Sequence, residues 1–229
     1  MSEKNYGMAV FDVDGTLLDT TEGMLAAVRY AVQAAGLPLL SEEAFLTFIG
    51  PPIQNSLKAH YELSDEEVQR IAELFRDRYK TKDLFKAVPY RGIYELLDRL
   101  KEADIKIAIA TYKREDYALE LLRYFHFDRY TDIMHGADNF NKLRKKDIII
   151  KCMKEAGISD YQHAVMIGDS ENDAIGAEAL GMNFLGVTYG FGFRSAEDVN
   201  VFPNIGIAEK PVEIGGFLME SKNITFPSR

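Results

Sequence analysis

The sequence predicts an α/β protein in which a doubly wound parallel sheet carries a small all-helical cap domain. Short, mostly apolar runs occur at 8–11, at 105–110 apart from Lys106, at 164–168 and at 183–187 after Asn183, and such runs are typical of strands buried on both faces. Helical patterns separate these runs, as in parallel βαβ units. Residues 20–83, between the first two runs, read as helix throughout and contain no strand candidate, which favours an inserted helical domain.

The helices of the inserted segment have recognisable starts and stops. The first begins at Thr20 or Thr21 as its cap and ends at Gly36, and three more are expected at 41–48, 53–60 and 64–80. The remaining expected elements are helices at 93–103, 116–125, 147–156 and 174–180, a weak strand at 131–135 and a short helix near Ala196. We therefore expect a core domain made of residues 1–19 and 84–229 and a cap domain made of residues 20–83.

Composition excludes several classes of function. The 229-residue chain has a formal net charge of −9, which disfavours nonspecific binding to nucleic acid or to an anionic membrane. Cys152 is the only cysteine, so an intrachain disulfide is excluded. No apolar run approaches the roughly 18 residues of a membrane span, and the start of the chain shows no signal peptide. A cytoplasmic protein, monomeric or homodimeric, is expected.

The stretch FDVDGTLLDT places two carboxylates, Asp12 and Asp14, directly after the first strand. Open α/β sheets bind their ligands at the carboxyl ends of the strands. A calcium loop of the EF-hand type also begins Asp-x-Asp-Gly, but it needs a fifth-position ligand and a glutamate at position twelve. Those positions hold Thr16 and Gly23, which disfavours calcium. A plain strand-to-turn junction with solvated acids is the other alternative.

Polar residues also follow the later strands. Thr111 ends the second apolar run, Asp169 follows the run at 164–168, and Asp173 comes four residues after Asp169. A cluster of basic residues, Lys142, Arg144, Lys145 and Lys146, precedes the helix expected at 147–156. Each feature has a simpler explanation: Thr111 as a strand terminus, Asp173 as the N-cap of the helix at 174–180, and the basic cluster as a solvated surface.

Together, in this chain order, these motifs resemble the haloacid dehalogenase-like (HAD) hydrolases. The matching motifs are Asp-x-Asp-x-Thr at 12–16, a threonine at Thr111, a lysine in the basic cluster, and Gly-Asp-x-x-x-Asp at 168–173. The resemblance implies that Asp12 attacks phosphorus to form an aspartyl-phosphate and that Asp14 is the general acid and base. Ion-pumping members carry threonine where this chain has Asp14, and the dehalogenases lack this second aspartate, so hydrolysis of phosphate esters is favoured.

The resemblance also implies a metal and a phosphate site. Clustered carboxylates need a cation among them, and oxygen ligands in a phosphate site favour Mg²⁺. By resemblance the ligands are Asp12, the backbone carbonyl of Asp14 and Asp169, with Asp173 acting through water. The hydroxyls of Thr16 and Thr111 would bind phosphate oxygens, and a lysine would neutralise nucleophile and phosphate.

Lys145 is the predicted lysine of the third motif. Relatives with Lys-x-Asp-x-Ile place the lysine two residues before the aspartate, which here is Asp147, the expected N-cap of the helix at 147–156. Lys146 would point away from the first strand, and Lys142 is further from the helix.

Within the family, the stretch IGPPIQNSL and the motif GDSENDAIGAEALGM resemble phosphoglycolate phosphatase-like members. The function implied is Mg²⁺-dependent hydrolysis of a small phosphorylated metabolite, phosphoglycolate or a nucleoside monophosphate. The alternatives are a sugar-phosphate phosphomutase and a phosphoaccepting receiver domain, although the latter lacks a helical insert. Gly50-Pro51-Pro52 either contacts the leaving group or simply connects two helices.

Overall fold

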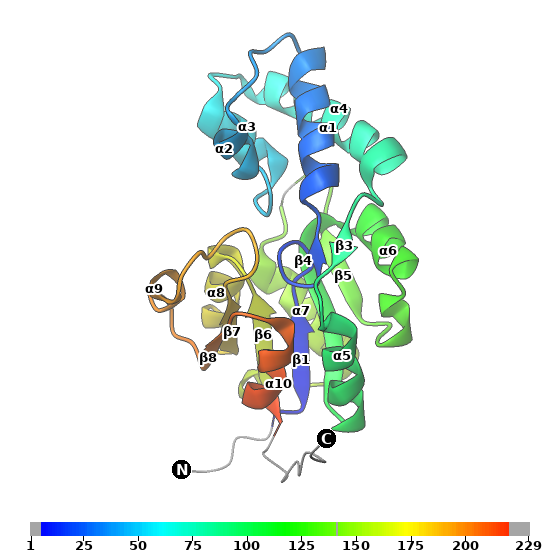
Figure 1. Ribbon diagram of the computed structural model, residues 1–229, viewed down its shortest axis with the longest axis vertical. Coiled ribbons are helices and arrows are strands. Elements are labelled where there is room, and N and C mark those ends of the chain that lie inside the picture. The colour runs from blue at the N-terminus through cyan, green and yellow to red at the C-terminus, as the bar shows by residue number, and fades with distance from the viewer. Residues whose placement is uncertain (1–5, 141, 220–229) are drawn as a thin grey trace, which may run out of the picture.

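The computed structural model describes residues 6–140 and 142–219, and its centre is a six-stranded parallel sheet (Figure 1). The strand order is β5-β4-β1-β6-β7-β8, with β1 in the middle between β4 and β6. The strands are β1 (Met8–Phe11), β4 (Lys106–Arg114), β5 (Met134–Ala137), β6 (Ala164–Gly168), β7 (Asn183–Val187) and β8 (Gly206–Ala208). The predicted fold class is confirmed.

Helices cover both faces of this sheet, so its strands are buried on two sides. They are α5 (Ile93–Glu102), α6 (Glu115–Tyr124), α7 (Lys145–Ala156), α8 (Glu171–Glu178), α9 (Ala196–Val199) and α10 (Pro211–Leu218). Side chains of β1 alternate between two apolar cores: Phe11 packs in the core that contains α5, α6 and α10, and Val10 in the core that contains α7 and α8. The double burial explains the uninterrupted apolar runs of the central strands.

A helical cap stands over the carboxyl ends of the strands (Figure 1). It consists of α1 (Thr21–Ala34), α2 (Glu42–Leu46), α3 (Ile53–His60), α4 (Asp65–Arg78) and a π-helical turn (Tyr79–Asp83). Ser64 and Glu67 form a reciprocal capping box at the start of α4, and the buried face of α4 follows from Val68, Ile71, Ala72 and Phe75 at three- and four-residue spacing.

A two-stranded antiparallel ribbon, which was not expected from the sequence, joins the cap to the core. It pairs β2 (Leu18–Asp19) with β3 (Val88–Pro89), on either side of the inserted segment. Each strand has only two residues, too short for a periodic pattern to be recognised. The exact domain division at residues 20 and 83 stays a prediction.

Two expected helix caps are wrong. Helix α8 begins at Glu171 because Ser170 is its N-cap, and Asp173 is the third helical residue, accepting from the backbone N–H (3.2 Å) and Oγ (2.6 Å) of Ser170. Helix α7 begins at Lys145 after Arg144, and Asp147 accepts from the backbone N–H of Arg144 at 2.8 Å. In both helices the aspartate lies in the first turn and accepts a hydrogen bond from the N-cap residue. Helix α8 therefore begins three residues earlier than expected, and α7 begins two residues earlier.

Strand boundaries also differ from the expectation. β4 continues past Thr111 to Arg114, with a break in its register against β5 between Ala110 and Arg114. β5 lies at 134–137 rather than 131–135. In the region after residue 188, the short helix expected near Ala196 is α9, whereas β8 and α10 were not expected, and the chain after 219 lies outside the described residues. In the described part of the chain, no helix is both long and apolar enough to span a membrane.

Candidate active site

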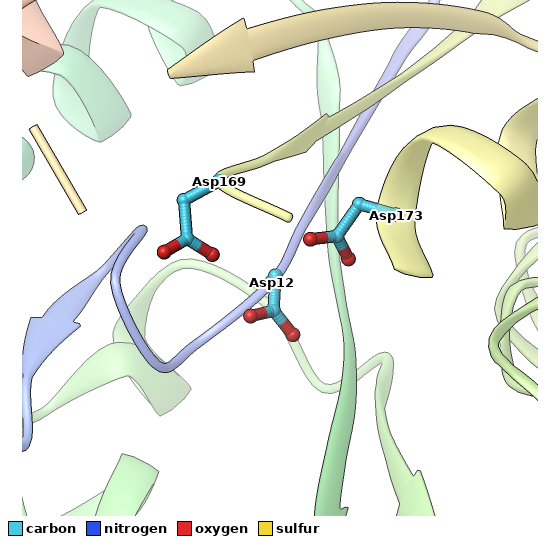
Figure 2. Close-up of side chains that lie close together, drawn as sticks. All are labelled: Asp12, Asp169 and Asp173. Atoms are coloured by element: carbon cyan, nitrogen blue, oxygen red, sulfur yellow. The ribbon is translucent and has the colours of Figure 1, made fainter. Parts of the chain in front are cut away.

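Three buried carboxylates converge at the carboxyl edge of the sheet (Figure 2). Asp12 follows β1, Asp169 follows the adjacent strand β6, and Asp173 lies in the first turn of α8. Each offers an oxygen within 4.8 Å of those of the other two. Their exposed fractions are 7%, 2% and 0%, so water screens their mutual repulsion poorly.

Lys145 supplies a positive charge to this cluster. Its ammonium lies 2.6 Å from Asp12 Oδ1 and 2.7 Å from Asp173 Oδ1, and it donates to the carbonyl of Ala110 at 2.9 Å. Lys145 is 2% exposed, whereas Lys142 and Lys146 are exposed. The structure therefore brings together Asp12 and the lysine that the sequence analysis selected from the basic cluster.

Two glycines permit this close packing. A Cβ atom on Gly15, whose φ is +83°, would lie 2.1 Å from Asp169 Oδ2. A Cβ atom on Gly176, in α8, would lie 2.8 Å from Cγ of Lys145. Because Gly15 has no side chain, Asp169 can approach the first motif, and because Gly176 has none, the aliphatic part of Lys145 can pass beside α8.

Asp14 has two partners that the sequence analysis did not assign to the site. The Thr20 hydroxyl donates to its Oδ1 at 2.5 Å instead of capping α1, and the ammonium of Lys113 lies 3.1 Å from the same oxygen. Lys113 is 6% exposed and also donates to the Tyr79 hydroxyl of the cap at 3.0 Å. Thr20 follows the first motif directly and Lys113 lies two residues after Thr111, so both are near motif positions in the sequence. Neither position alone distinguishes a site residue from a surface residue.

The two predicted phosphate-binding threonines lie on the first and second motif segments. Thr16 is fully buried, and its hydroxyl has no hydrogen-bond partner among the described residues. Thr111 is 1% exposed, and its Oγ1 accepts from the backbone N–H of Lys113 at 3.1 Å. Their contact with phosphate stays a prediction.

Backbone N–H groups orient the carboxylate of Asp169. The N–H groups of Phe191 and Gly192 donate to Asp169 Oδ2 at 2.6 and 3.1 Å, which holds the orientation of its other oxygen. These donors come from the loop after β7, a region where the sequence analysis found no pattern.

The electrostatics of the cluster fit a divalent cation. Burial raises the pKa of Asp12 well above its ordinary value against the effect of Lys145, and Asp173, Asp169 and Asp14 raise it further. Burial and then Asp173 raise the pKa of Asp169 to about 7. The site has four buried carboxylates and two buried ammonium groups, so it is short of two positive charges when ionised. Oxygen ligands with this deficit suit a hard divalent cation.

Burial alone would lower the pKa values of the two lysines. For Lys145 the contacts with Asp12 and Asp173 outweigh burial and raise the pKa above its ordinary value. For Lys113 the neighbouring Asp14 and Tyr79 do the same. Both ammonium groups therefore stay charged at neutral pH.

The cap loop Gly50-Pro51-Pro52 lies between two hollows at the cap–core junction. A small cavity of about 60 Å³ is lined by Asp14, Lys113 and the cap residue Arg76. A larger hollow of about 790 Å³ is bordered by Asp169 and the loop after β7. The loop lines both, so it is placed where a cap residue could contact a substrate bound at the carboxylates.

The comparisons with known proteins agree with this site. The family model described as haloacid dehalogenase-like hydrolase matches residues 9–187. The chain belongs to this family. The match begins in β1 and ends at β7, and so it includes every strand that carries a predicted site residue.

The relatives at 30% identity or above include proteins named 5'-nucleotidase and phosphoglycolate phosphatase, and mycobacterial relatives at 27% identity are named tyrosine-protein kinase PtkA. A 5'-nucleotidase of Pseudomonas aeruginosa is 30% identical over 82% of this chain and 85% of its own. A phosphoglycolate phosphatase of Agrobacterium fabrum is 31% identical over 80% of this chain and 81% of its own. The solved structure of a predicted phosphatase from Clostridium acetobutylicum, 32% identical, has a TM-score of 0.83 and covers 90% of this chain and 94% of that one. This HAD-family member is therefore a phosphatase.

Proposed function

We propose that the protein is a Mg²⁺-dependent phosphomonoester hydrolase that acts through an aspartyl-phosphate on Asp12. The observation that supports this most is the contact of Lys145 with both Asp12 and Asp173, beside Asp169. A carboxylate so placed can attack phosphorus because a neighbouring cation offsets the approach of two negative charges. Asp12, the backbone carbonyl of Asp14 and Asp169 would hold Mg²⁺, with Asp173 acting through water.

In the proposed first step, a carboxylate oxygen of Asp12 forms a bond to phosphorus, and the bond from phosphorus to the ester oxygen breaks. Asp14 donates a proton to that oxygen, so the alcohol leaves neutral. When bound, Mg²⁺ supplies positive charge that offsets the charge on the transferring phosphoryl group. Lys145 and the hydroxyls of Thr16 and Thr111 would bind the phosphoryl oxygens.

In the second step, water attacks the phosphorus of the aspartyl-phosphate while Asp14 takes a proton from it. The bond from phosphorus to the Asp12 oxygen breaks, which regenerates the carboxylate and releases inorganic phosphate. Asp14 thus gives a proton in the first step and takes one in the second. Its contacts with Thr20 and Lys113 fix its position for both.

The substrate we propose is a small phosphorylated metabolite, with phosphoglycolate or a nucleoside monophosphate as candidates because relatives carry both names. No nucleic acid or membrane partner is proposed, and a cytoplasmic monomer or homodimer stays a prediction.

The test is phosphate release from a panel of phosphorylated metabolites and an aryl phosphate by the purified protein. Activity should vanish with EDTA and return with Mg²⁺, and full turnover in EDTA would contradict the proposed site. Product analysis separates hydrolysis from the phosphomutase alternative, because a mutase moves the phosphoryl group within a sugar phosphate instead of releasing it.

A further inference from the structure

One buried arginine of the cap lacks an ionic partner. Arg76, in α4, is 7% exposed, and within residues 6–140 and 142–219 no carboxylate oxygen lies within 4.0 Å of its guanidinium nitrogens. Arg78, two positions later, pairs with Asp83 at 2.7 Å. A buried, unpaired guanidinium is costly, so Arg76 is a position where an anion would be stabilised.

The present partner of Arg76 is a neutral oxygen shared with the core. Nη1 of Arg76 donates to Oδ1 of Asn139 at 3.1 Å, and Nη1 of Arg114, at the end of β4, donates to the same atom at 3.1 Å. Arg114 is already neutralised by Asp116 through two contacts of 2.6 and 2.7 Å. Arg76 is therefore the member of the pair without a carboxylate in direct contact. Burial lowers its pKa, and Arg114 lowers it further, against the opposing effects of Tyr117, Glu73 and Asp138.

Arg76 shares the small cavity with the proposed general acid. Asp14 and Arg76 both line it, with Lys113 and Arg114 as further basic residues. Asp138 also lines it, and its carboxylate accepts from the backbone N–H groups of Phe140 and Leu143. Because Asp14 protonates the departing oxygen, the rest of the leaving group would occupy this cavity rather than the larger hollow beside Asp169. A volume of about 60 Å³ corresponds to roughly four water-sized positions, enough for a two- or three-carbon group.

We propose, on the basis of the hydrolase function above, that Arg76 is a specificity-determining residue that binds a carboxylate carried by the leaving group. The preferred substrates are then phosphate esters of small hydroxy acids. The carboxylate replaces Asn139 Oδ1 as acceptor, and the planar guanidinium can bind its two oxygens together. Since Arg76 belongs to the cap and Arg114 to the core, the same anion would hold the cap against the core.

The test compares phosphoglycolate with its neutral amide, which has nearly the same size and shape. The wild-type kcat/KM should be roughly 10–100-fold higher for the acid than for the amide. Arg76→Gln should remove this preference and leave kcat for an aryl phosphate nearly unchanged, and Arg76→Lys should restore part of it. Arg70→Gln is the matched control, because Arg70 is an exposed arginine of the same helix.

Equal wild-type rates for acid and amide would overturn the proposal, and so would an equal loss on every substrate in a folded Arg76→Gln. A clear preference for ethanediol bisphosphate over phosphoglycolate would assign the residue to a second phosphate instead. If Arg76→Gln does not fold, the wild-type ratio and Arg76→Lys decide. Binding of phosphoglycolate and of its amide can also be compared without turnover, from the shift in Tm that each causes in EDTA. A failure of the hydrolase proposal, seen as no aryl phosphate turnover with Mg²⁺, is therefore distinct from a failure of this one.

Discussion

At the scale of single residues, Lys145 has the most specific position in the site. It is the buried cation that contacts both Asp12 and Asp173, so its removal leaves two carboxylates without their neutralising partner. We predict that Lys145→Ala lowers kcat for an aryl phosphate by roughly 10²–10³-fold. Lys146→Ala and Lys142→Ala, which change exposed side chains, should stay within about twofold of wild type. Steady-state kinetics of the three folded variants decide the point, and a dead Lys146→Ala would refute the assignment.

Asp169 makes the stability of the metal-free protein depend on pH. Its folded pKa of about 7, raised by burial and by Asp173, lies above the ordinary value of 3.8. Between these values the folded state holds a proton that the unfolded chain has released, so stability falls as pH rises. We predict that Tm in EDTA decreases between pH 5 and pH 8 and that Asp169→Asn reduces this decrease. An unchanged pH dependence in the variant would contradict the raised pKa.

Some site residues were predictable and others were not, for a physical reason. Asp12, Asp14, Asp169 and Lys145 of the candidate site lie at positions that match the family's motifs, so the resemblance was enough to select them. Thr20 and Lys113 reach Asp14 from opposite sides of the inserted cap, separated by more than ninety positions, and their contact depends on how the cap meets the sheet. Local pattern carries no information about such long-range contacts.

At the scale of secondary-structure elements, the loop 50–52 connects α2 to α3 and faces the site. Gly50 has φ of +99°, a conformation that favours glycine, and Pro52 is the N-cap of α3. Because it lines both hollows, we predict that replacing Pro51 and Pro52 with alanine changes the ranking of substrates more than it changes the aryl phosphate rate. The measurement is kcat/KM across a metabolite panel. An unchanged ranking would favour the alternative of a simple connecting turn.

Elements with strong periodicity were predicted well, and element ends were not. The four apolar runs became β1, β4, β6 and β7 because strands buried on both faces leave an unmistakable pattern. The starts of α7 and α8 were misplaced because Asp147 and Asp173, which lie in the first turn, accept a hydrogen bond from the backbone N–H of the N-cap residue. In the sequence, such an aspartate resembles an N-cap. The ribbon β2–β3 and strand β8 were missed because two or three residues have no period.

At the scale of the whole molecule, the candidate site lies where the core domain meets the helical cap, and both parts contribute side chains to it. The carboxylate cluster and Lys145 belong to the sheet and its helices, whereas Arg76, Tyr79 and the loop 50–52 reach toward it from the cap. The alternation of strands and helices, and the long helical stretch between the first two strands, were enough to predict this two-part architecture. How closely the two parts approach follows from side-chain packing and could not be read from the pattern.

The central claim is a phosphoryl group carried on Asp12 and removed with the help of Asp14. An aryl phosphate has a good leaving group that needs no proton, so Asp14→Asn should still form the aspartyl-phosphate but hydrolyse it slowly. Rapid mixing of this variant with an aryl phosphate and Mg²⁺ should release about one phenolate per active site in a burst. Mass spectrometry of the acid-quenched protein should then find the phosphoryl group on Asp12. Steady turnover at the wild-type rate without a burst, or a phosphoryl group on another residue, would contradict the account.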